Sequence, residues 1–167
     1  MSASNALASL FLSKLEEQIE RARHLISLIP ADQLEWKPQP DSLRVCELLG
    51  HMLECLAGFC ATLYAVNSDR LAHFSALREL PVNHCCEIEE AIERTRDYAL
   101  YIREGFALLA DDDLAKRVPT VFVAEGEQVM TLLLGNFEHL VNHKYQLFFY
   151  LKMLGAGVKT GDLYHMR

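Results

Sequence analysis

The sequence lacks the features that would place it at a membrane or on a nucleic acid. No apolar run approaches the roughly 18 residues that a membrane-spanning helix needs. Residues 1–10 have neither the basic start nor the small-residue cleavage site of a secretory signal. The net charge is −7 and lysine and arginine are not grouped, whereas nucleic-acid binding relies on grouped cations. These absences predict a cytoplasmic protein with no membrane or nucleic-acid partner.

Common catalytic and metal-binding motifs are also missing. The chain has no HExxH, no phosphate-binding glycine loop and no GxSxG. The ExxH pairs that di-iron bundles carry on two helices are absent, which disfavours a ferritin-like centre. Any active site must therefore be found from residue placement rather than from a compact motif.

The cysteines do not form a recognisable framework. There are five of them, an odd number, with no CxxC pair. Without a secretory signal, this pattern disfavours disulfides and a thiolate zinc site. We expect reduced thiols that act mostly as small hydrophobic residues, with oxidant sensing by Cys85 and Cys86 as the alternative. The five are Cys46, Cys55, Cys60, Cys85 and Cys86.

What is present is a strong helical pattern. Apolar residues recur at steps of three and four along four long segments, which predicts an all-α four-helix bundle formed by one domain, residues 1–167. Pro30 ends the first helix because proline cannot donate the next helical hydrogen bond. Gly155 and Gly157 end the last helix. The expected helices span about 5–29, 42–66, 87–109 and 127–154.

The connections between these helices are expected to be irregular. Residues 30–41 form a proline-rich, extended linker, after which Asp41 or Ser42 caps the second helix. A short helix is expected around residues 70–80. The connection at 111–126 is expected to be briefly extended at residues 121–123.

Two histidines stand out on the last helix. His139 and His143 are four residues apart, so one helical turn places both imidazoles on the same face. His51 lies on an otherwise apolar second helix and supplies a third ligand if the two faces oppose each other. Three imidazoles would leave positions open on a bound ion, as catalytic sites do. The alternative is that these histidines bind only carboxylates or backbone groups.

Several polar residues share the faces of these histidines. They are candidates for orienting a ligating imidazole or a substrate, with ordinary surface positions as the alternative. These candidates are Glu47, Glu54, Asn136, Asn142 and Gln146. The other histidines have no partner at helical spacing and are expected at the surface: His24, His73, His84 and His165.

Two stretches of the sequence resemble the DinB/YfiT-like family of metalloenzymes. They are LEWKPQPDSLRVCELLGHMLE and LLLGNFEHLVNHKYQLFFYLKMLG. Family members typically have a Trp-x-Pro linker before a helix with one histidine, and a last helix with His-x-x-x-His, Gln and Tyr-Leu-x-x-x-Gly. The matching residues here are Trp36, Pro38, His51, His139, His143, Gln146, Tyr150, Leu151 and Gly155. One departure is Asn142, where many members have a second consecutive histidine.

The resemblance implies a four-helix bundle of unusual connectivity and a site of three histidines, His51, His139 and His143, that binds one divalent metal ion. Zinc or nickel is favoured, with iron or copper also suited to imidazole. Relatives include enzymes that use a low-molecular-weight thiol, as S-transferases or isomerases acting on a small-molecule substrate. The shared name does not imply the activity of the DNA polymerase also called DinB.

Two other functions stay open on the sequence alone. One is a non-catalytic bundle in which the metal is structural or absent, and the other is a metal-dependent hydrolase. The resemblance also implies a homodimer, and an apolar stripe on the last helix suggests a surface for it, with burial under the linkers as the alternative. The stripe consists of Phe137, Val141, Phe148 and Leu151.

Overall fold

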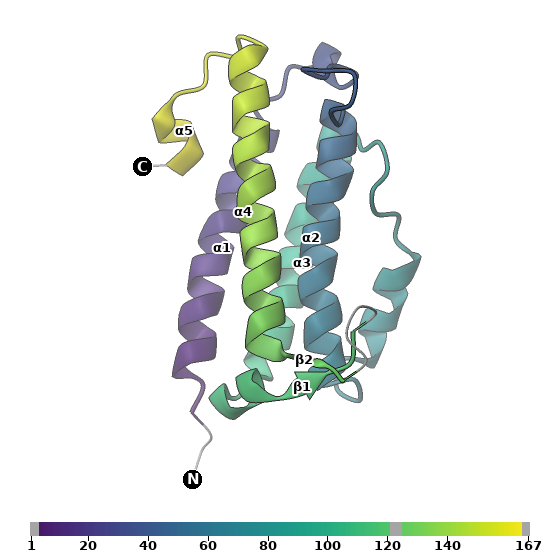
Figure 1. Ribbon diagram of the computed structural model, residues 1–167, viewed down its shortest axis with the longest axis vertical. Coiled ribbons are helices and arrows are strands. Elements are labelled where there is room, and N and C mark those ends of the chain that lie inside the picture. Colours follow the sequence, from purple (N-terminus) through teal and green to yellow (C-terminus); the bar gives the residue numbers. More distant parts are fainter. Residues whose placement is uncertain (1–3, 121–124, 165–167) are drawn as a thin grey trace.

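Four long helices lie side by side along one axis (Figure 1). The computed structural model describes residues 4–120 and 125–164 of the 167-residue chain. This arrangement confirms the predicted all-α fold, with each helix close to its expected range. The helices are α1 (Ala6–Ile26), α2 (Val45–Val66), α3 (Ile88–Ala107) and α4 (Val129–Met153).

Shorter elements connect the long helices. A two-residue strand, β1 (Arg117–Val118), pairs antiparallel with β2 (Glu127–Gln128), which the sequence analysis did not predict. The expected short helix near residues 70–80 is the 3₁₀ helix η2. Residues 121–123 and His165, for which we made predictions, lie outside the described residues. The remaining short elements are η1 (Ala31–Gln33), η2 (Ala72–Glu79), η3 (Asp111–Ala115) and α5 (Thr160–Tyr164).

The connectivity places α2 between α3 and α4. Helix α2 packs against both of these helices, and α1 packs against the same two from the other side. Figure 1 shows that α2 and α3 run in the same direction, because the long connection after α2 returns along the outside of the bundle. The start of α3 is thereby brought back to the start of α2. This return brings the connection alongside the histidine of α2.

Helix α2 is the central element of the apolar core. Its side chains are buried on most faces, including Leu48, Leu53 and Phe59. Although Glu47, His51 and Glu54 interrupt its apolar sequence, α2 is the one helix among the described residues that is long and apolar enough on average to cross a membrane. More than half of that stretch, 56%, is buried inside the bundle, as expected for a core helix.

The helix ends differ in detail from the predictions. Helix α2 starts after Arg44 rather than at Asp41 or Ser42. The linker itself satisfies the first N–H groups of α2, because the Leu34 and Trp36 carbonyls each accept a bond of 2.9 Å from them. The Glu47 side chain, rather than Asp41 or Ser42, caps the Arg44 N–H at 2.8 Å.

The other ends follow ordinary terminal chemistry. Helix α1 ends at Ile26, four residues before Pro30. After it, the N–H groups of Leu28 and Ile29 donate to carbonyls three residues earlier, as in a 3₁₀ turn. Helix α4 ends as predicted, with Gly155 in the left-handed region at φ 71°.

The apolar stripe expected on α4 is not an open surface. Phe148 and Leu151 are buried in the core of the chain itself. Phe137 packs against Phe11 of α1, with ring centroids 5.7 Å apart. The stripe therefore gives no support to a homodimer, which stays a prediction from the resemblance alone.

Lys144 is buried on α4, and its amine donates to Gln18 Oε1 at 2.7 Å. Burial, together with the charges of Arg21 and Lys14, lowers the pKa of Lys144 from 10.5 to about 8. Below pH 8 the amine is charged in both folded and unfolded chains. Between pH 8 and 10.5 the unfolded chain binds a proton that the folded chain does not, so stability rises with pH. At about 1.4 kcal/mol per pKa unit, the rise is on the order of 3 kcal/mol.

We therefore expect wild type to gain about 3 kcal/mol relative to Lys144→Met between pH 7.5 and 10.5. Urea unfolding of both proteins at the two pH values measures this difference. Other groups that titrate in this range, such as the buried thiols, are common to both proteins and cancel. Parallel pH dependence of the two proteins would contradict the prediction.

Candidate metal centre

Three imidazoles meet between α2 and α4. His51, His139 and His143, here called the histidine triad, have ring centroids 4.4 to 4.9 Å apart. Their metal-binding nitrogens all lie within 4.8 Å of one another. His51 Nε2 and His139 Nε2 are 3.1 Å apart. The three rings thus converge as the sequence predicts, one from α2 and two from adjacent turns of α4.

His143 is held by a chain of polar and aromatic contacts. Its Nδ1 lies 2.8 Å from Gln146 Oε1, and the Gln146 amide donates to the Tyr150 hydroxyl at 3.0 Å. The Tyr150 ring meets Trp36 of the linker edge-on, at 5.4 Å between centroids. An amide oxygen can only accept, so Nδ1 of His143 carries the proton and Nε2 keeps its lone pair. Gln146 therefore orients His143 for binding through Nε2.

His51 is oriented by two oxygen atoms. Its Nδ1 lies 2.8 Å from Glu54 Oε2 and 2.6 Å from Asn83 Oδ1. Because both partners accept, Nδ1 carries the proton and the Nε2 lone pair faces the other two imidazoles. A ligating histidine that donates its other N–H to a carboxylate or amide is the usual arrangement around protein-bound metals.

Asn83 comes from the connection between α2 and α3, and three contacts fix it. Cys85 forms a disulfide with Cys46, at 4.5 Å between Cα atoms. The Cys86 N–H donates to the Cys46 carbonyl at 3.0 Å. At Gly50 the missing side chain lets the His84 backbone approach closely, since an added Cβ would lie 2.8 Å from His84 N. Together these contacts clamp the connection onto the first turns of α2.

The disulfide corrects the expectation that all five cysteines are reduced. Cys46 and Cys85 are far apart in the sequence, and the return of the chain along α2 brings them together. Spacing alone does not reveal such a pair. The other three thiols are buried, and burial raises the pKa of Cys55, Cys60 and Cys86 to about 12. They stay protonated at neutral pH and are therefore poor nucleophiles.

Removing the disulfide should cost stability. The bond joins residues 39 positions apart, so Cys46→Ser combined with Cys85→Ser should lower the free energy of unfolding by about 2–4 kcal/mol. Urea unfolding of oxidised wild type, dithiothreitol-reduced wild type and the double variant provides the comparison. The two proteins without the bond should agree with each other. Equal stability of oxidised and reduced wild type would count against the bond.

Burial keeps the histidine triad in its metal-binding form. Desolvation lowers the pKa of His139, and the neighbouring His51 lowers it further. Desolvation also lowers the pKa of His143, although the hydrogen bond that its Nδ1–H donates to Gln146 acts in the opposite direction. Neutral imidazole is the species that ligates a metal, so these shifts reduce competition from protons at neutral pH.

The geometry fits one divalent ion. With metal–nitrogen bonds of about 2.0–2.1 Å, ligand nitrogens lie roughly 2.8 to 3.4 Å apart for angles between 90° and tetrahedral. The 3.1 Å between His51 Nε2 and His139 Nε2 falls in that range. The residues present can therefore hold a metal, with the other ring nitrogens of His51 and His143 already anchored.

Three of the polar residues that were predicted to orient the histidines or a substrate do not contact the triad. Glu47 does not face the triad. It accepts from the Arg44 backbone N–H at 2.8 Å and from its guanidinium at 2.7 Å, and these bonds lower the pKa of Glu47 to about 2. Asn142 is exposed and Asn136 lines a neighbouring pocket. Of the five candidates, Glu54 and Gln146 contact the triad.

Two other groups in the described part of the chain bring possible ligands together. Glu35 lies beside Cys46 and Cys85, but the disulfide occupies both sulfurs. His84 and Cys86 meet at Glu90, which already accepts from the Arg94 guanidinium at 3.2 Å. A cation beside that carboxylate disfavours a second one. The histidine triad is the better metal site.

Sequence reasoning missed Asn83 and the pair of cysteines that positions it. Asn83 is in the left-handed region at φ 53°, which Asn tolerates better than most residues. Its signal in the sequence is weak, an Asn shortly after Pro81 in an irregular segment. His84 and His24, expected at the surface, are half-buried and face Glu90 and Asp162.

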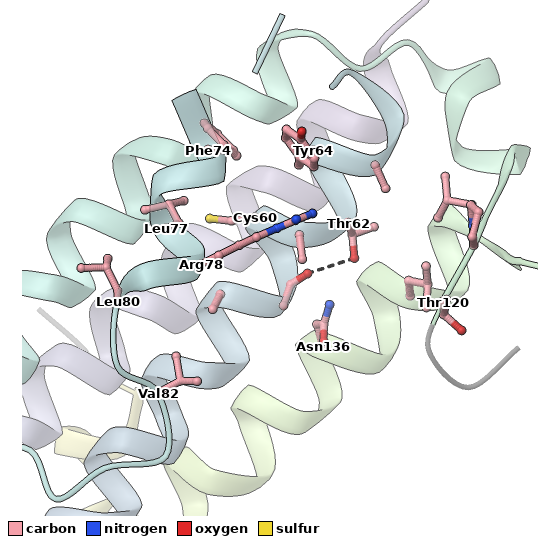
Figure 2. Close-up of a pocket in the computed structure, with 17 residues that line it drawn as sticks. Cys60, Thr62, Tyr64, Phe74, Leu77, Arg78, Leu80, Val82, Thr120 and Asn136 are labelled. Carbon is pink, nitrogen blue, oxygen red and sulfur yellow. Dashed lines mark hydrogen bonds between the residues drawn. The ribbon is translucent and has the colours of Figure 1, made fainter. Parts of the chain in front are cut away.

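A cavity of about 780 Å³ lies beside the triad, between the second half of α2, η2 and the start of α4 (Figure 2). Its lining is mostly aliphatic and aromatic. Val82, which precedes Asn83, lines it, and so does Asn136, three residues before His139. Two residues of the cavity lining are thus close in sequence to residues of the histidine site.

Comparison with known proteins identifies the fold. No protein-family model matches the chain, and no curated protein matches its sequence. Among solved structures, the chain is similar to the crystal structure of a DinB-like protein, YjoA, from Bacillus subtilis. The TM-score is 0.67 at 18% identity, over 87% of this chain and 92% of that chain. This similarity confirms the predicted DinB-like fold.

Proposed function

We propose that this protein is a metal-dependent enzyme in which His51, His139 and His143 hold one divalent ion, zinc or nickel, and that it joins a low-molecular-weight thiol to an electrophile. An S-transferase or an isomerase would use such chemistry. The observation that carries the proposal is the convergence of three imidazoles from two helices beside a cavity. Three protein ligands leave coordination positions open, which favours a catalytic over a structural metal.

The surrounding residues would support this chemistry by orientation. Gln146 fixes the ring of His143, while Glu54 and Asn83 fix that of His51. A divalent ion favours a thiolate over a thiol at neutral pH, and the thiolate is the nucleophile. The cysteines of the chain are disulfide-bonded or buried, so the thiol would come from a separate small molecule. The DinB/YfiT resemblance supports this choice by analogy.

Two alternatives are less well supported. A metal-dependent hydrolase needs a free general base near the ion, but the nearby Glu54 carboxylate is already bound to His51. A purely structural metal would favour a closed set of four protein ligands, whereas three histidines converge here. Cytoplasmic location remains part of the proposal, since small thiols are abundant there.

Turnover with a defined thiol–electrophile pair tests the proposal. Tag-free protein loaded with Zn²⁺ or Ni²⁺ is mixed with glutathione or another small thiol and 1-chloro-2,4-dinitrobenzene. A sulfur–carbon bond forms as the carbon–chlorine bond breaks, chloride leaves, and the thiol proton passes to solvent. We expect metal-dependent turnover that chelation abolishes and metal restores. Stoichiometric metal without turnover on any thiol–electrophile pair would favour the non-catalytic alternative.

A further inference from the structure

The cavity beside the triad is mostly apolar and carries one positive charge. Its volume of about 780 Å³ is in the range of small-molecule sites. Among the lining residues that the structure describes, none is acidic and Arg78 alone is charged. Phe74, Leu77 and Leu132 are among the apolar side chains that form most of the wall. Such a cavity favours a ligand with an apolar body and one negative charge.

Arg78 is placed to bind an anion. Its guanidinium lies over the Tyr64 ring, 5.4 Å from the centroid, and Figure 2 shows the side chain extending from η2 across the space towards α2. Within the described part of the chain it forms no ion pair with a carboxylate, whereas Arg44 and Arg94 do. Stacking on an aromatic ring leaves the N–H groups of a guanidinium directed outward, where they can bind a carboxylate through two parallel hydrogen bonds.

The opposite wall offers a polar amide. Asn136 of α4 points into the cavity in Figure 2, and its amide makes no hydrogen bond to another described residue. Gly58 of α2 makes room for it, since a Cβ there would lie 2.7 Å from Asn136 Oδ1. Asn136 is about 4.5 Å along the helix axis from His139 at 1.5 Å per residue. A ligand in the cavity can therefore contact both Arg78 and Asn136, the lining residue that precedes His139 by three positions on α4.

We infer that this cavity binds the substrate of the centre, a small organic anion whose aromatic or aliphatic body fills the apolar space. Its anionic group, a carboxylate or a sulfonate, pairs with Arg78, and its other end lies towards Asn136 and the histidine triad. The link to the triad rests on the proposed function, while binding of the anion does not. The two parts can therefore be tested separately.

Binding of a matched pair of probes to metal-free protein tests the site. The probes are 8-anilinonaphthalene-1-sulfonate and its uncharged analogue N-phenyl-1-naphthylamine, both of which become fluorescent in apolar sites. Arg78→Gln should weaken sulfonate binding about tenfold and leave the neutral probe unchanged, because a charge-assisted contact is lost. Arg96→Gln, an exposed arginine on α3 outside the cavity, is the control and should change neither. Ala61→Trp, which fills the cavity from an exposed position on α2, should abolish both.

The outcomes distinguish a specific anion site from nonspecific binding of apolar probes. Equal sulfonate binding by wild type and Arg78→Gln would overturn the anion site, as would neutral-probe binding that survives Ala61→Trp. His139→Ala should keep sulfonate binding even as it loses Zn²⁺, so failure of the metal site is distinguishable from failure of this one. In Co²⁺-loaded wild type the sulfonate should shift the visible spectrum. Saturating sulfonate that binds without any shift would overturn the link to the triad.

Discussion

Replacement of His139 by Ala is expected to lower the affinity for Zn²⁺ by more than about 100-fold. His139 Nε2 is 3.1 Å from His51 Nε2, so its loss removes one of three converging ligands. Outer-shell changes around protein metals typically cost 10–100-fold, and loss of a ligand should exceed this. Competition with a chromophoric chelator measures the affinity, on protein without an affinity tag because a histidine tag would bind the metal itself.

Two neighbours on the same helix provide graded controls for this variant. Gln146→Leu removes the acceptor that holds His143 Nδ1, and should weaken Zn²⁺ binding by about 10–100-fold. Asn142→Ala changes an exposed side chain next to the ligand and should have no effect. The affinities should therefore fall in the order Asn142→Ala, Gln146→Leu, His139→Ala. Wild-type affinity in the His139 variant would exclude this residue as a ligand.

Replacement of Gly50 by Ala is expected to disturb stability and the metal centre together. The added Cβ would meet the backbone of His84, at 2.8 Å from N and 3.0 Å from C, and backbone cannot move aside like a side chain. Overpacking of this kind costs about 3 kcal/mol or more. The connection must shift off α2, which carries Asn83 away from His51 and should weaken Zn²⁺ binding about tenfold.

Gly135→Ala is the matched control for this substitution. Gly135 is also a helix glycine, in α4, but an added Cβ would meet nothing within 4 Å. It should raise stability by about 0.5–1 kcal/mol through helix propensity alone and leave Zn²⁺ affinity unchanged. Urea unfolding and chelator competition are compared for both variants. A Gly50→Ala protein as stable as wild type would show that the connection does not pack closely on α2.

The long helices and the His139–His143 pair could be predicted because both follow from local periodicity. Apolar steps of three and four residues locate the four helices, and four-residue spacing places His139 and His143 on one face. Gln146 is one turn from His143 on that same face, so its contact follows from the same spacing. His51 was identified as a polar residue on a helix that is otherwise apolar.

The connection between α2 and α3 could not be predicted for a physical reason. Its position depends on tertiary contacts far apart in the sequence: the Cys46–Cys85 disulfide, the bond from Cys86 to Cys46, and the close approach at Gly50. None of these has a helical or strand period. Asn83 depends entirely on them, and so does the wall of the cavity that Val82 forms.

Glu47 shows the opposite error. It shares a helix with His51 and is one turn away, yet its carboxylate is taken by the Arg44 N–H and guanidinium at the start of the helix. Helix spacing gives the face of a residue, but competition for hydrogen bonds near a helix end decides its partner.

Metal stoichiometry in solution tests the central claim most directly. Tag-free protein is stripped with a chelator and titrated with Co²⁺, and its visible spectrum and bound-metal content are followed together. The structure predicts one ion per chain with imidazole ligation, and none at comparable affinity in the His51→Ala, His139→Ala or His143→Ala proteins. Equal Co²⁺ uptake by wild type and all three variants, or no uptake by folded wild type, would contradict it.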